Sequence, residues 1–232
     1  MEPIFPANPI ERVGFYGGRI AQGLWGEPLN LATDIALVVY LLIFFIKLRK
    51  EGFADKPVYG LVMLGGLVGL GSVIFHSYPT RVTLRMDMIP ITIFGLCYVF
   101  FTLRRFLQLT YRNSILLTLL FLLYSMGFEA AVKILKVPGM HHLSSIFALI
   151  VMSVILRHKQ RDPRIGKGFI IASGIYVLAL FFRFLDLIVW RLFPLGTHFL
   201  WHAGTACVLG LLLHLAAVDK ESGYHTRQTI EP

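Results

Sequence analysis

The sequence predicts an all-α fold: an integral membrane protein built as a bundle of seven transmembrane helices. Of its 232 residues, 56% are hydrophobic and only 15% are charged. The mean hydropathy is +0.70, which is too high for a soluble domain. Seven apolar stretches approach the roughly 20 residues that a helix needs to cross a hydrocarbon core of about 30 Å. These stretches cover about residues 30–47, 58–76, 88–106, 114–132, 142–157, 169–190 and 197–216.

Proline and glycine mark most of the connections between the stretches, at Pro57, Pro79, Pro138, Gly139, Pro163 and Pro194. Pro90 and the glycines of "GLVMLGGLVGLG" lie inside stretches, where membrane helices tolerate them. The fifth stretch is the shortest. The connections are too short for a second domain, so residues 1–232 are expected to form one domain. Within it, residues 1–29 form an N-terminal segment and residues 217–232 a tail.

The distribution of charge predicts how the chain crosses the membrane. The net charge is +9, but it does not cluster as in a nucleic-acid-binding protein. Seven Lys and Arg lie in the N-terminal segment and in the connections after the second, fourth and sixth stretches. Fourteen lie in the connections after the first, third and fifth stretches and in the C-terminus, and Arg183 lies within a stretch. The positive-inside rule therefore places the N-terminus outside and the C-terminus in the cytoplasm.

The N-terminus does not have the pattern of a cleavable signal peptide. Cys97 and Cys207 both lie within stretches, so no disulfide is expected.

Polar residues from three predicted helices converge at one membrane depth. Ser72 and His76 lie four residues apart at the outer end of the second stretch, and therefore on one face of a helix. Asp87 lies near the outer start of the third. His198 and His202, again four apart, begin the seventh. Nothing in the hydrophobic pattern requires this coincidence, which is why it indicates a site.

The residue types indicate a metal centre. Two histidines at positions i and i+4 can share one metal ion, and His76 could supply a third nitrogen from a facing helix. Three protein ligands leave one position of a tetrahedral zinc ion open, as in catalytic sites, where a bound water becomes a nucleophile. Asp87 would then take and return protons, and the Ser72 hydroxyl would donate to an oxyanion. We therefore expect one Zn²⁺ per chain.

Other interpretations remain open at this point. Histidines in membranes also serve as hydrogen-bonding groups between helices, and Ser72 could be a small packing residue. Arg183 and Asp186, three residues apart in the sixth stretch, either neutralise each other or leave Asp186 to orient a metal-bound histidine. A b-type haem protein could use His76 and His202. A retinal protein would need a lysine in 197–216, which has none. A transporter is disfavoured because the ionisable residues gather at one end.

The ordered set Ser72, His76, Asp87, His198 and His202 resembles the superfamily of seven-span membrane hydrolases that includes alkaline ceramidases and adiponectin-type receptors. The segments "GLWGEPLNLATD", "FRFLD" and "LGTHFLWH" resemble the alkaline ceramidase branch, particularly its bacterial members. The resemblance implies a zinc-dependent hydrolase that splits a ceramide-like membrane lipid into a long-chain base and a fatty acid. It implies that His76, His198 and His202 bind zinc while Ser72 and Asp87 act in catalysis. A non-catalytic lipid receptor of the same superfamily is the alternative. Neither nucleic acid nor any protein partner is implied.

The chain departs from that family at one place. Eukaryotic members hold calcium outside the first span, and Glu27, Asn30 and Asp34 match the later part of that site. The upstream part reads "GFYGGR", with glycines where those members carry carboxylates. Calcium prefers six to eight oxygen ligands, some of them charged. We therefore expect Glu27, Asn30 and Asp34 to form at most a residual calcium or structural site, and activity to need no added calcium.

Overall fold

The computed structural model describes residues 19–20, 23–133, 142–158, 163–189 and 192–221, and within them the chain is entirely helical apart from turns and connections. Seven α-helices are present: α1 (Pro28–Lys50), α2 (Lys56–Ser77), α3 (Arg81–Arg105), α4 (Tyr111–Lys133), α5 (His142–His158), α6 (Pro163–Val189) and α7 (His198–Glu221). The predicted all-α bundle of seven helices is thereby confirmed. Six of these helices are long and apolar enough to cross a membrane, and α5, with 17 residues, is shorter.

Each apolar stretch corresponds to one helix, but the helices extend beyond the apolar residues. α3 begins at Arg81, so Asp87 lies in its second turn, near the end of the helix at which it was expected. α7 continues to Glu221, so the first five residues of the expected tail are helical. Hydropathy sets where a helix enters the membrane, whereas backbone hydrogen bonding and capping decide where it ends. The rest of the tail lies outside the described residues.

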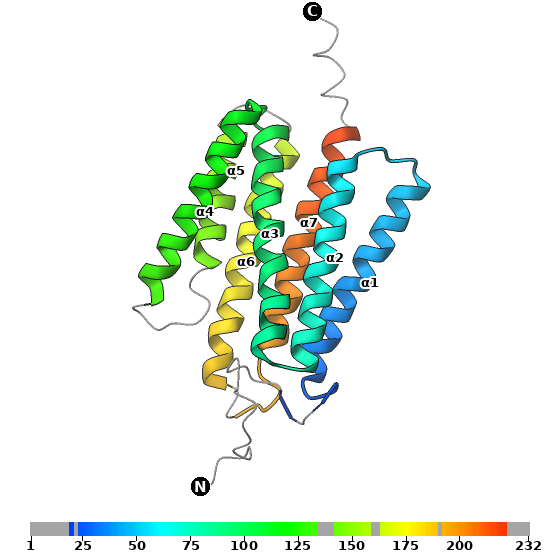
Figure 1. Cartoon of the computed structure of the whole chain (residues 1–232), viewed down its shortest axis with the longest axis vertical. Coiled ribbons are helices and arrows are strands. Elements are labelled where there is room, and N and C mark those ends of the chain that lie inside the picture. Colours follow the sequence, from blue (N-terminus) through cyan, green and yellow to red (C-terminus); the bar gives the residue numbers. More distant parts are fainter. Residues whose placement is uncertain (1–18, 21–22, 134–141, 159–162, 190–191, 222–232) are drawn as a thin grey trace, which may run out of the picture.

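The helices form one bundle with α2, α3, α6 and α7 at its centre (Figure 1). α2 packs against α1, α3 and α7, and α6 packs against α5 and α7, whereas α4 makes its main contact with α3. The core between α1, α2, α3 and α7 is aliphatic and aromatic. Tyr98 of α3 donates its hydroxyl to the carbonyl of Leu212 at 2.9 Å, which ties α3 to α7 inside this core.

The outer surface of the bundle is apolar. Large hydrophobic side chains such as Ile43, Met63, Leu67, Leu123 and Ile188 are more than half exposed. A soluble monomer rarely exposes so much contiguous apolar surface. In a bilayer, by contrast, these side chains contact lipid and every backbone group is satisfied inside its own helix. The architecture therefore fits an integral membrane protein.

The two ends of the bundle carry different polar residues. At one end, the Asp55 side chain accepts from the Val58 amide at the start of α2 and pairs with Arg105 at the end of α3 at 2.7 Å. The opposite end, where α2 and α6 finish and where α1, α3 and α7 begin, is the lower end in Figure 1. All five residues of the predicted site lie toward this lower end.

Candidate metal centre

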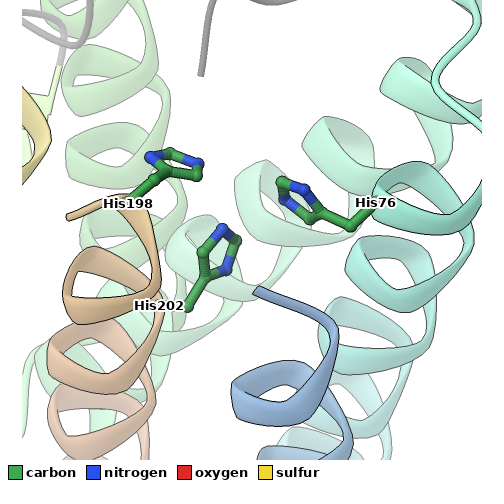
Figure 2. A group of neighbouring side chains, drawn as sticks. All are labelled: His76, His198 and His202. Atoms are coloured by element: carbon green, nitrogen blue, oxygen red, sulfur yellow. The ribbon is translucent and has the colours of Figure 1, made fainter. Parts of the chain in front are cut away.

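Three histidines come together from two helices. His76 lies in the last turn of α2, and His198 and His202 occupy the first two turns of α7. One ring nitrogen of each lies within 4.8 Å of the others, close enough to hold a metal ion. Their rings converge on one point between α2 and α7 (Figure 2). His76 and His198 are each only 1% exposed, so the site is enclosed by the bundle.

Asp186 at the end of α6 fixes the start of α7. Its carboxylate accepts hydrogen bonds from the backbone amides of Thr197, at 2.7 Å, and His198, at 3.1 Å. The Thr197 hydroxyl donates to the carbonyl of Phe182 on α6. A carboxylate at a helix N-terminus satisfies otherwise unpaired amides and complements the helix dipole. Asp186 therefore fixes the backbone that carries His198. The Arg183 guanidinium lies 4.9 Å from the ring centroid of Trp201.

Glu27 supports His76. The Nδ1 of His76 donates to Glu27 Oε2, which also accepts from the Asn30 amide at 2.8 Å. The other oxygen, Oε1, accepts from Arg19 Nε at 2.8 Å and forms an ion pair with a terminal nitrogen of Arg19 at 2.7 Å. Burial alone would raise the pKa of Glu27, but its hydrogen bonds with His76 and Asn30 and the nearby charge of Arg19 favour the ionised form, and that pKa is lowered. The carboxylate is therefore held ionised.

Asp34 supports His202 in the same way. Its Oδ1 lies 2.8 Å from Nδ1 of His202, and the Asp34 side chain is 3% exposed. Where such a carboxylate is ionised it can only accept a hydrogen bond, and the Nδ1 of the histidine that it supports then carries the proton. That tautomer leaves the Nε2 lone pair for a metal, which is the arrangement that carboxylates produce at histidine metal sites.

Sequence reasoning assigned Glu27, Asn30 and Asp34 to a residual calcium or structural site and missed their role beside the histidines. Their spacing of i, i+3 and i+7 places all three on one helical face. Polar residues in an apolar span face the bundle interior, so this signal was present in the sequence. The contacts of Glu27 already use the roughly four lone-pair positions of a carboxylate. A calcium ion would have to displace at least one of them. The glycine-containing "GFYGG" lies outside the described residues.

Ser72 and Asp87 lie beside the histidines. The Ser72 side chain lies close to the Asp87 carboxylate, which also interacts electrostatically with His76 and His202. Both side chains are buried, at 5% and 8% exposure. Their contact depends on Gly71, because a Cβ at that position would lie 2.1 Å from the Met86 carbonyl oxygen. The absent side chain lets the backbones of α2 and α3 touch next to Asp87.

The residues present fit a bound metal ion. Among the described residues, the Nε2 of His202 is a buried polar atom that has no hydrogen-bond partner. Leaving such an atom unpaired costs about 1–3 kcal/mol, and a metal ion would satisfy it. Imidazole nitrogens suit Zn²⁺ and similar transition metals, whereas Mg²⁺ and Ca²⁺ prefer oxygen ligands. The cluster can therefore hold one metal ion.

Comparison with protein-family models and with curated proteins finds no match to this chain. The fold and the site thus define its class: an all-helical protein of membrane type with a buried three-histidine cluster at one end of its bundle.

Proposed function

We propose that the protein is a membrane-embedded zinc hydrolase that cleaves the amide bond of a ceramide-like lipid. The observation that carries this proposal is the buried cluster of His76, His198 and His202, in which Glu27 and Asp34 orient two of the imidazoles. A purely structural site would fill all four positions of a tetrahedral ion, whereas three protein ligands leave one for water or substrate. The resemblance to alkaline ceramidases supplies the substrate class.

The proposed chemistry assigns one task to each nearby residue. When bound, zinc supplies a Lewis acid and makes a coordinated water acidic enough to attack at neutral pH. Asp87 accepts the proton that the water loses as the new C–O bond forms. It then delivers that proton to the amide nitrogen as the C–N bond breaks, which yields a fatty acid and a long-chain base. Once Asp87 is protonated, it is neutral and attracts the Ser72 hydroxyl less strongly. The hydroxyl can then donate a hydrogen bond to the oxyanion instead.

Two other functions use the same residues. A lipid receptor would bind the lipid without turnover. A haem protein would need a macrocycle between two histidine rings, but the His76 and His202 centroids lie only 4.5 Å apart. Carbon atoms are in van der Waals contact at about 3.5–4.0 Å, so these rings leave no layer for a porphyrin. The spacing favours a single shared ion.

Metal analysis with turnover measurements tests the proposal. The purified protein is expected to contain about one zinc per chain and to hydrolyse lipid amides in a panel that includes matched esters. His202→Ala should lose both the metal and the activity. His214→Ala is the matched control, since His214 lies three turns further along the same helix and is exposed. Full zinc content in His202→Ala would contradict the assignment of the three histidines as zinc ligands. Zinc binding without turnover of any lipid would favour the alternative of a non-catalytic lipid receptor.

A further inference from the structure

Arg19 connects the segment before α1 to the metal centre through two hydrogen bonds and an ion pair. Its Nε and one terminal nitrogen both contact Glu27 Oε1, at 2.8 and 2.7 Å. A terminal nitrogen also donates to the backbone carbonyl of His76 at 2.9 Å. One guanidinium therefore contacts the carboxylate that orients His76 and the backbone that carries His76. Arg19 was not part of the site predicted from the sequence.

A short turn brings Arg19 to this position. The amide of Ile20 donates to the carbonyl of Gly26 at 2.8 Å, which closes a loop between Arg19 and Glu27. Gly23 within the loop has a φ of +87°, a conformation that other residues rarely adopt. The loop is thus closed at its base, and the arginine is placed beside the carboxylate by local backbone geometry.

The charges explain why a guanidinium suits this position. Glu27 is 5% exposed, and a buried carboxylate is costly unless it is paired and hydrogen-bonded. The planar guanidinium presents several N–H groups in a fixed fork, whereas the ammonium of lysine is a point charge on a flexible stem. By occupying Oε1, Arg19 leaves Oε2 to Asn30 and His76. The division of the two oxygens fixes the plane of the carboxylate.

We propose that Arg19 is a positioning residue of the metal centre, whose guanidinium holds Glu27 and the last turn of α2 so that His76 presents Nε2 toward His198 and His202. The inference rests on the proposed occupancy of the three histidines by a metal, but not on the identity of the lipid. It gives Arg19, which lies before α1, a part in metal affinity that is exerted through Glu27 and the backbone of His76. Partners that orient a ligating histidine typically change metal affinity by 10–100-fold when removed.

The test is the zinc affinity of the full-length protein, measured by competition with a chromogenic chelator. Arg19→Gln removes the charge and the fork, and is expected to weaken zinc binding by about tenfold, the lower end of that range, because Arg19 acts through Glu27. Arg19→Lys keeps the charge and should recover only part of the loss. Arg81→Gln is the control: it removes the same charge from an exposed arginine at the same end of the bundle.

Cobalt substitution supplies a second measurement, the wavelength of a Co²⁺ absorption band. Partial loss of folded protein would lower the intensity of that band but would not shift its wavelength. The visible absorption band of the Co²⁺-loaded protein reports the geometry of the ligands, and we expect it to shift in Arg19→Gln and to stay unchanged in Arg81→Gln. Wild-type zinc affinity in Arg19→Gln, or an equal loss in both variants, would overturn the inference. Absence of zinc binding by the wild-type protein would instead overturn the metal assignment itself, so the two failures are distinguishable.

Discussion

At the scale of single residues, the site contains three carboxylates with separate positions. Glu27 and Asp34 contact the Nδ1 atoms of His76 and His202, so they orient the imidazoles. Asp87 instead lies beside Ser72 and interacts with His76 and His202 electrostatically. In the proposed reaction, Asp87 is therefore the carboxylate to which we assign the proton transfer.

This difference predicts separate effects on metal and on rate. Asp87→Asn keeps the shape and removes the proton acceptor, so zinc content should remain near the wild-type level while kcat falls by about 10²–10⁴-fold, the usual contribution of general acid–base catalysis. Zinc analysis and steady-state kinetics on the same preparation check this. Asp34→Asn is the informative comparison, because it should weaken zinc binding as well. Near-normal turnover by Asp87→Asn would assign the proton transfer to another group.

At the scale of elements, the site depends on how closely α2 and α3 approach each other. Gly71 allows the two backbones to touch at Met86, directly before Asp87. α6 and α7 approach closely in a similar way at Gly204, where a Cβ would lie 2.5 Å from the Cβ of Ala179. Small residues at such crossings are typical of packed membrane helices. Here the crossings also set the distances between residues of the site.

A single added methyl group tests this dependence. Gly71→Ala should push α3 away from α2 and separate Asp87 from Ser72. It should also lower the free energy of unfolding by about 1–3 kcal/mol. A displacement of about 1 Å in a catalytic group can cost on the order of 10²-fold in rate. Gly66→Ala on the same helix is the control, because its Cβ would meet nothing within 4 Å. Thermal unfolding and turnover of both variants are the measurements, and equal behaviour would contradict the role of the close approach.

At the scale of the whole molecule, the site lies toward one end of the bundle, and the majority of basic residues lies in the connections at the other end. The split of seven to fourteen Lys and Arg predicts that the site faces the outer half of the membrane. A hydrolase with this orientation would meet lipid substrates in the outer leaflet.

Labelling of single cysteines tests the orientation. In a background that lacks Cys97 and Cys207, Tyr78→Cys at the site end should react with a membrane-impermeant maleimide added to intact cells. Glu51→Cys, at the opposite end, should react only after permeabilisation. Both positions are more than half exposed, so accessibility is matched. A reporter fused after Pro232 should be active in the cytoplasm. The reverse labelling pattern would place the site at the inner face.

The sequence by itself determined the helices and the principal polar residues. Helix formation and membrane insertion depend on runs of about 20 apolar residues, which are local features, so all seven helices could be predicted with errors only at their ends. Ser72, His76, Asp87, His198 and His202 could also be predicted, because the alternation of spans fixes which helix ends meet. None of this requires knowing how the helices pack.

Only the tertiary structure decided which partners these residues have. Glu27 contacts His76 across 49 positions of the chain, and Asp34 of α1 contacts His202 of α7, at the other end of the sequence. Periodicity shows that Glu27, Asn30 and Asp34 share a face, but not which helix that face meets. The positions of Arg19 beside Glu27, and of Asp186 at the start of α7, likewise depend on connections whose geometry apolar patterning does not encode. Hydrogen bonds between distant segments form only after the helices have packed, and for that physical reason no local pattern specified them.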